Sequence, residues 1–347
     1  MSHSSRQHQD GGAFVALLLL VVVVGAVGYW LWQDYERFRS SPLHISGQGF
    51  NYQVKPGTSL NAVANDLKAK GILRQPLYLR ALAMDLGVSN KIKAGEYMIP
   101  AGTTPEMLLE RFVRGKVIEY SLTLIEGWTF ERALDAVRGH PMLVQTLPDN
   151  LSTEQVMQRL GYPGQYPEGR FFPDTYFFPR GTTDVDFLRR SYERMQTILA
   201  EEWGGRSEDL PLKTPYEALT LASLIEKETG VPEERDEVAG VFVRRLQKGM
   251  LLQTDPTVIY GLGDSYDGNI RKTDLTTDTP YNTYTRPGLT PTPICLPGRA
   301  SIHAALHPAE GTALYFVATG NGGHTFSDTL QEHNRAVSKY LQNRKKN

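Results

Sequence analysis

The longest hydrophobic pattern lies near the start of the chain. Residues 13–32 form an unbroken apolar run, rich in Leu and Val, that ends with Tyr29, Trp30 and Trp32. As a helix rising about 1.5 Å per residue, this run spans about 30 Å, the thickness of a bilayer's hydrocarbon core. Aromatic rings favour the membrane interface. The pattern therefore predicts a single transmembrane helix at 13–32, preceded by a polar tail at 1–12.

A cleaved signal peptide is the alternative interpretation of this run. The run is too long for one, and it ends in bulky residues without a small-residue cleavage site. A linker is expected at 33–46. Arg6 precedes the run, and Arg37 and Arg39 follow it close to acidic residues, so the basic residues leave the orientation open.

Alternating and helical patterns then predict a small αβ unit at residues 47–116. Residues 50–54 alternate like a strand, and apolar positions at helical spacing follow in 60–67. A second helix is expected near 77–86 and a closing strand at 94–100. This order, with V-x-x-G-x-[ST]-L at its start and G-x-Y-x-I-P at its end, resembles a LysM module. The resemblance implies binding of N-acetylglucosamine-containing glycans; without it the unit would be a spacer.

One helix in the second half is unusually well delimited. Thr214 suits the N-cap, Glu217 completes a capping box and Gly230 supplies a left-handed stop. At about 100° per residue, Glu226 and Glu228 both project at the margins of its apolar face. A partly dehydrated carboxylate suits proton donation near neutral pH. Surface ion pairs with nearby Lys and Arg residues are the alternative, and the helix alone does not decide.

Two groups of loops carry further candidate chemistry. Residues 166–179 are dense in prolines and aromatic residues, which excludes a helix and predicts a rigid loop. Flat aromatic faces with interleaved acids suit a sugar-binding cleft, although the aromatics could equally pack in the core. The proline-rich residues 288–298 are expected to lie against a surface or to line a cleft.

Composition excludes several classes of function. A net charge of −1 offers no electrostatic basis for nucleic-acid binding, and the lone Cys295 excludes a disulfide framework and a cysteine-rich zinc site. His303 and His307 stand four apart, but no H-E-x-x-H motif, nucleophile elbow or phosphate loop occurs. We therefore expect no metal and no cofactor. A carboxylic acid near aromatic and amide-bearing loops remains, which favours glycan chemistry.

Most glycosidases use two carboxylates. Glu168, Asp174 and Asp255 are candidates for a second acid, but the sequence does not place any of them within reach of Glu226. A mechanism with one acid requires a substrate that supplies its own nucleophile.

Several motifs in order resemble the signatures of the YceG-like family of endolytic murein transglycosylases. They lie at residues 168–176, 221–229, 253–261, 280–284 and 323–334, and the resemblance extends from Phe50 to the C-terminus. It implies an α+β fold in which a mixed α/β catalytic domain at 117–347 follows the LysM-like module. It also implies an inner-membrane protein with its catalytic domain in the periplasm and the tail at 1–12 in the cytoplasm.

The resemblance further implies cleavage of the β-1,4 bond between N-acetylmuramic acid and N-acetylglucosamine in nascent peptidoglycan strands. The products carry 1,6-anhydro ends, strand growth is terminated, and penicillin-binding synthases are the expected partners. Glu226 matches the catalytic acid and base of the family, which leaves Glu228 as its neighbour in a supporting role. The residues expected to contact the glycan are Glu168, Asp174, Tyr176, Gln253, Asp255, Asn282 and Tyr284.

Two rival functions stay open at this point. One is a glycan-binding scaffold without enzymatic activity, which would use the LysM-like module. The other is a hydrolase in which Glu226 works with Asp174 or Glu168, and which would give reducing ends instead of anhydro ends.

Overall fold

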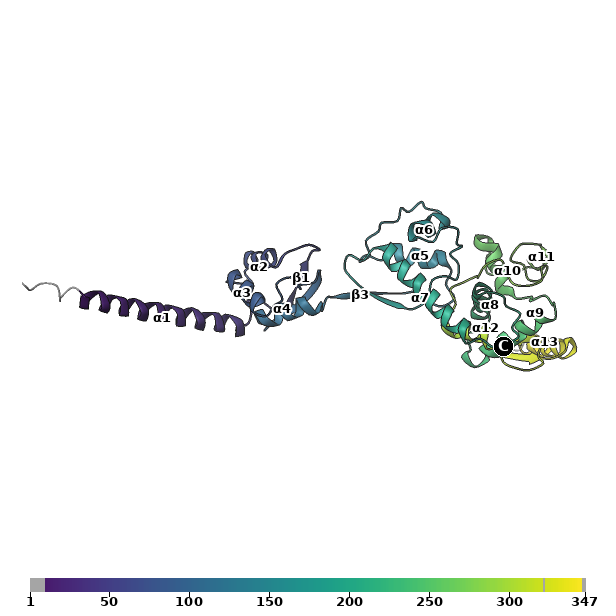
Figure 1. Ribbon diagram of the computed structural model, residues 1–347. Helices are drawn as coiled ribbons and strands as arrows, with labels where there is room; N and C mark the ends of the chain where they lie inside the picture. Colours follow the sequence, from purple (N-terminus) through teal and green to yellow (C-terminus); the bar gives the residue numbers. More distant parts are fainter. Residues whose placement is uncertain (1–9, 321, 345–347) are drawn as a thin grey trace, which may run out of the picture. The chain divides into compact units, whose positions relative to one another are not determined.

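The computed structural model describes residues 10–320 and 322–344, so most of the predicted tail at 1–12 lies outside the described residues. The chain divides into two compact units, with the boundary between Tyr120 and Ser121 (Figure 1). Both units combine helices with small two-stranded sheets. The expectation of a mixed helix and sheet protein with one N-terminal apolar helix is therefore confirmed for the described residues.

The apolar run lies in a long helix, α1 (Asp10–Ser40). Within the described residues it is the helix that is long and apolar enough to cross a membrane. It continues past the predicted end at residue 32, because its last turns pack against the rest of the first unit. The Tyr78 hydroxyl donates to Asp34 (2.9 Å), and Arg39 pairs with Glu106 (2.9 Å).

The first unit follows the predicted order of strand, helix, helix and strand, with one more helix after it. Its elements are β1 (Gly49–Val54), α2 (Leu60–Ala69), α3 (Pro76–Asp85), β2 (Gly95–Pro100) and α4 (Pro105–Arg114). β1 and β2 pair antiparallel, with Tyr52 opposite Tyr97. Tyr97 is fully buried against Phe112, and its hydroxyl donates to the Lys93 carbonyl (2.7 Å), which satisfies its polar end.

The second unit is mainly helical. Its elements are β3 (Glu119–Thr123), which crosses the boundary, α5 (Phe130–Arg138), α6 (Thr153–Leu160), β4 (Thr175–Pro179), α7 (Asp184–Gly204), α8 (Pro215–Glu228), α9 (Arg235–Gln247), α10 (Asp255–Leu262), α11 (Lys272–Thr276), α12 (Arg299–Leu306), β5 (Tyr315–Ala318), β6 (His324–Ser327) and α13 (Leu330–Arg344). β3 pairs with β4, and β5 pairs antiparallel with β6.

α8 is the central helix of this unit. Residues 218–225 are all buried, so the helix is enclosed on every side by α7, α9, α10 and α12. The predicted N-cap is confirmed, since the Thr214 hydroxyl accepts the Glu217 N–H. The predicted stop at Gly230 is wrong. The helix ends at Glu228, because Thr229 is extended and its hydroxyl accepts the Val231 N–H (3.0 Å).

The proline-rich segment 288–298 lies against α8. Packing against a surface was one of its two expected placements. The Ser223 hydroxyl on α8 accepts the Ile294 N–H (3.0 Å), and the Cys295 thiol donates to the Ser223 carbonyl (3.3 Å). The Cys295 side chain is therefore buried, and its thiol is hydrogen-bonded within the fold. This packing brings residue 298 and the start of α12 to the end of α8, where Glu226 lies.

Candidate active site

The Glu226 side chain lies at the N-terminus of α12. It projects from the last turn of α8, is half-buried, and accepts two hydrogen bonds on one oxygen. The Gly298 N–H donates to Oε2 (3.0 Å), and so does the Ser301 hydroxyl (2.7 Å). Gly298 is the N-cap of α12 and has no side chain, so the Glu226 carboxylate caps this helix from another element.

The two oxygens of Glu226 differ in their surroundings. Oε2 is held as an acceptor by both donors, whereas within the described residues Oε1 makes no hydrogen bond. A proton on this carboxyl group would therefore reside on Oε1. The arrangement fixes the orientation of the group and leaves one oxygen available to exchange a proton with a ligand.

Glu228 projects to a different side of the helix end. It accepts a hydrogen bond from the Thr254 hydroxyl (2.6 Å), and burial raises the pKa of its carboxyl group. It lines a cavity of about 440 Å³ with three other predicted residues, Gln253, Asp255 and Tyr284. The Tyr284 hydroxyl donates to Asp255, so four of the predicted positions meet in this cavity.

Glu168 lines a second cavity, of about 630 Å³, together with Tyr166, Tyr260 and Tyr281. Its carboxylate accepts the Phe130 N–H (2.9 Å) and the Tyr260 hydroxyl (3.1 Å). Burial raises the pKa of Glu168 to about 7, although these hydrogen bonds lower it.

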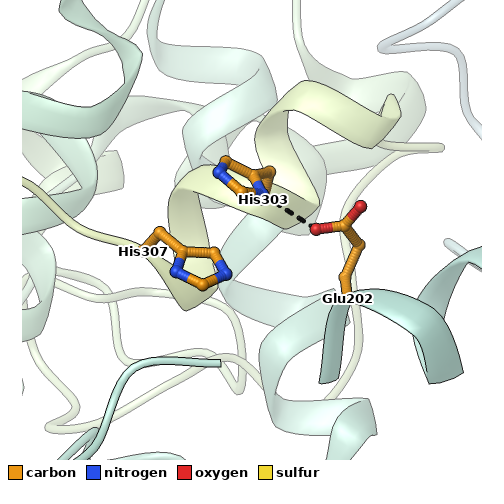
Figure 2. A group of neighbouring side chains, drawn as sticks. All are labelled: Glu202, His303 and His307. Atoms are coloured by element: carbon orange, nitrogen blue, oxygen red, sulfur yellow. Dashed lines mark hydrogen bonds and ion pairs between the residues drawn. The ribbon is translucent and has the colours of Figure 1, made fainter. Parts of the chain in front are cut away.

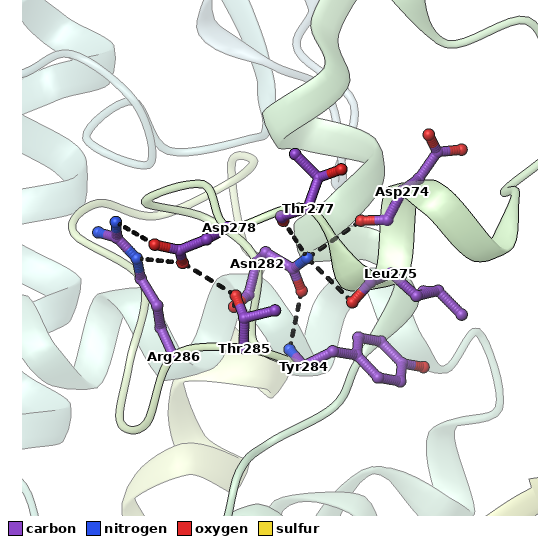
Figure 3. Close-up of polar contacts among 8 residues, drawn as sticks. All are labelled: Asp274, Leu275, Thr277, Asp278, Asn282, Tyr284, Thr285 and Arg286. Carbon is purple, nitrogen blue, oxygen red and sulfur yellow. Dashed lines mark hydrogen bonds and ion pairs between the residues drawn. The ribbon is translucent and has the colours of Figure 1, made fainter.

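Asn282 is buried and holds the segment around α11 together. Figure 3 shows its amide nitrogen directed at the carbonyls of Asp274, Leu275 and Thr277, at 3.0, 3.2 and 2.7 Å. Its amide oxygen accepts the Tyr284 N–H (2.9 Å). The side chain thus uses its hydrogen-bonding capacity on the backbone around it.

Tyr176 and Asp174 belong to the aromatic segment 166–179. Tyr176 is buried, and its hydroxyl donates to the Phe172 carbonyl (2.7 Å). Asp174 is exposed and accepts the Thr175 N–H (2.7 Å). Most aromatics of the segment pack in the core. The structure therefore does not bring Glu168, Tyr176, Asp255 and Asn282 to one surface.

The model of the YceG-like family matches residues 52–339, which is most of the chain.

The chain belongs to the YceG-like family.

Known relatives agree with this membership. An endolytic murein transglycosylase of Bacillus subtilis is 30% identical over 310 residues, which covers 84% of each chain. One from Streptococcus pneumoniae strain D39 is 25% identical over 372 residues and covers 94% of this chain, which spans 65% of that longer protein. The crystal structure of a YceG-like protein from Listeria monocytogenes matches 83% of this chain and 98% of its own, with 27% identity and a TM-score of 0.52.

In this YceG-like protein, a second carboxyl group that we did not predict lies beside Glu226. Glu126 is on the turn before α5, and its carboxyl group lies against the backbone of Gly298. The sequence signal was weak, because the segment Glu126-Gly127-Trp128-Thr129 has the pattern of an ordinary turn that opens a helix. No spacing along the chain links Glu126 with Glu226.

The YceG-like protein also groups two histidines with an acid. Figure 2 shows Glu202 of α7 directed at His303 of α12, with His307 next to it. Glu202 accepts from His303 Nδ1 (2.8 Å) and also pairs with Arg299 (2.6 Å). The three residues could together hold a metal ion. However, the two imidazole rings stack with centroids 4.2 Å apart, so their in-plane lone pairs do not converge.

Proposed function

We propose that this chain is a murein lytic transglycosylase in which Glu226 is the general acid and then the general base. The observation that carries the proposal is the Glu226 carboxyl group at the N-terminus of α12, with Oε2 fixed by two donors and Oε1 available. Membership in the YceG-like family, and relatives named endolytic murein transglycosylases, support this assignment.

The reaction has two proton transfers, one from Glu226 and one back to it, and consumes no water. Glu226 donates its Oε1 proton to the oxygen that bridges N-acetylmuramic acid and N-acetylglucosamine, and the bond from the muramic C1 to that oxygen breaks. The muramic C6 hydroxyl then attacks C1, and Glu226 takes the hydroxyl proton. The products are a free N-acetylglucosamine hydroxyl and a 1,6-anhydromuramic end, and Glu226 is protonated again.

We propose that the glycan binds in two cavities. Glu228, Gln253, Asp255 and Tyr284 line one, and Glu168 lines the other with three tyrosines. Gln253 supports the first assignment, since its φ of 53° is uncommon for a residue with a side chain, and such backbone strain clusters at functional sites. We propose that Asp174, Tyr176 and Asn282 act by holding the loops that line the site.

The remaining roles concern the first unit and the membrane. We propose that α1 anchors the chain in the inner membrane with the catalytic unit in the periplasm. The paired strands β1 and β2 with α2 and α3 are proposed as a LysM-like glycan-binding module. Cleavage of nascent glycan strands near penicillin-binding synthases would terminate the elongation of these strands.

The variant Glu226→Gln tests the central assignment. It keeps the shape of the side chain but removes the titratable proton, so we expect a loss of activity of about 1,000-fold. The assay follows anhydro-muropeptides by mass spectrometry after digestion of purified peptidoglycan. Glu233→Gln is the matched control, because Glu233 is exposed two residues before α9.

Three outcomes of these experiments would contradict this proposal. Wild-type activity in Glu226→Gln would remove Glu226 from the chemistry. Products that contain one added water would favour the hydrolase. Glycan binding without any cleavage by the wild-type chain would favour the scaffold.

A further inference from the structure

We propose that Glu126 is the second carboxylate of the reaction centre, where it stabilises the positive charge that develops on the muramic ring as the glycosidic bond breaks. This inference rests on the proposed function, because it assigns a partner to Glu226. It goes beyond that function, which needs only one acid.

Gly298 brings the two carboxyl groups together. Its N–H donates to Glu226 Oε2 at 3.0 Å. A Cβ atom built on Gly298 would lie 1.9 Å from Glu126 Oε1 and 2.4 Å from its Cδ, so the Glu126 carboxyl group occupies the space of a missing side chain. Any side chain at this position would displace the Glu126 carboxyl group from its place beside Gly298.

These contacts limit the separation of the two acids. The path from Glu226 Oε2 to Glu126 Oε1 runs through the N, the Cα and the added Cβ of Gly298. Since each of the two bonds on this path is about 1.5 Å long, the two oxygens lie within about 8 Å of each other. Pairs of carboxyl groups that act on one glycosidic bond are about 5 to 9.5 Å apart. Glu126 is exposed as a residue, so a ligand can reach it, while the Gly298 backbone covers part of its carboxyl group.

The turn that carries Glu126 is held by backbone pairing with the loop before α12. The Gly127 N–H donates to the Leu296 carbonyl (2.9 Å), and the Leu296 N–H donates to the Trp128 carbonyl (2.7 Å). Lys227, next to Glu226 on α8, donates to the Gly127 carbonyl (3.4 Å). Both acids are therefore fixed by the same loop, which is the preorganisation that electrostatic stabilisation requires.

The electrostatics of Glu126 agree with a functional role. Burial raises the pKa of its carboxyl group, the charge of Glu226 raises it further, and the charge of Arg235 lowers it. Two more cations contact the turn, since Lys227 donates to the Gly127 carbonyl and Arg132 stacks on the Trp128 ring. Two like charges beside one glycine do not favour folding, and such arrangements are typical of functional sites.

The proposed role leaves the proton balance of the reaction unchanged. The Glu226 proton moves to the bridging oxygen, which leaves with the electron pair of the broken bond. The ionised Glu126 then faces the electron-poor C1 and ring oxygen until the C6 oxygen forms its bond to C1. The C6 hydroxyl proton returns to Glu226, and Glu126 exchanges no proton.

The variant Glu126→Gln tests this role in the full-length protein in detergent, with purified glycan strands as substrate. We expect kcat to fall about 100-fold while KM stays within about threefold, because the charge acts in the transition state. Glu154→Gln is the matched control, since Glu154 is an exposed glutamate on α6. Thermal unfolding of each variant separates loss of fold from loss of charge.

A pH profile of kcat gives a readout that a purely structural role would not change. Because Glu126 must be ionised and its pKa is raised, wild-type kcat should fall on acidification at a higher pH than an ordinary glutamate would give. Glu126→Gln should lose this acid limb, and Glu126→Asp should restore part of kcat together with the limb.

The results separate this inference from the proposed function. If Glu126→Gln matches Glu154→Gln in kcat and keeps the acid limb, Glu126 has no part in the reaction, while Glu226 keeps its role provided that Glu226→Gln is inactive. A rise in KM alone would also overturn the inference. An active Glu226→Gln would instead remove the proposed function itself.

Discussion

At the scale of single residues, the carboxyl groups near α8 have different environments. Glu226 has one oxygen fixed and one available, whereas Glu228 is bonded to Thr254, and Glu168 is enclosed beside Phe130 and Tyr260. The sequence placed both acids of α8 at the margin of its apolar face, which the structure confirms as half-buried positions. It could not assign their partners, because Gly298, Ser301 and Thr254 are distant along the chain.

Glu168 should make the stability of the second unit depend on pH. Its pKa is about 7 in the folded chain, above the value of about 4.3 for an unfolded glutamate. Between these values the folded state binds more protons, so the free energy of unfolding should fall as pH rises from 4.5 to 8. Glu168→Gln removes this effect and should gain about 3 kcal/mol relative to wild type over that range.

Urea denaturation at several pH values, followed by tryptophan fluorescence, measures this difference. Glu154→Gln is again the control, because an exposed glutamate should change the pH dependence very little. Parallel pH curves for wild type and Glu168→Gln would show that Glu168 ionises normally.

At the scale of secondary structure elements, the Glu226 carboxyl group links the end of α8 to the start of α12. Local rules predicted the start of α8, since Thr214 and Pro215 determine it by short-range chemistry. They did not predict the capping of α12, because its cap comes from Glu226, on another helix. Local patterns likewise identified the segment 166–179 as a loop, but only tertiary packing decides which of its aromatics are buried.

Ser301 should affect the reaction through Glu226. Its buried hydroxyl is one of two donors to Oε2, and a hydrogen bond to a charged group is worth about 1.5–3 kcal/mol. Ser301→Ala should therefore lower kcat roughly 10-fold or more, with little change in KM. Steady-state kinetics beside Ser265→Ala, which alters an exposed serine, measures the effect. An unchanged kcat would mean that Gly298 alone orients the acid.

At the scale of the whole molecule, the apolar helix was the feature that sequence predicted most directly. Its hydrophobic length depends only on composition, whereas its continuation to Ser40 depends on contacts of Asp34 and Arg39 with the first unit. The order of elements in the first unit was also predictable, because period-two and period-3.6 patterns alternate clearly there. The cavities of the second unit were not, since loops far apart in sequence line them.

The orientation of the chain in the membrane can be tested with its single cysteine. Cys295 is buried and hydrogen-bonded to Ser223, and burial raises the pKa of its thiol, so it should react very slowly with maleimides. A cysteine introduced as Glu154→Cys is exposed on the second unit and should be labelled in intact spheroplasts by a membrane-impermeant maleimide. The native chain is the control for background. Labelling that requires permeabilised membranes would place the second unit in the cytoplasm and contradict the proposed orientation.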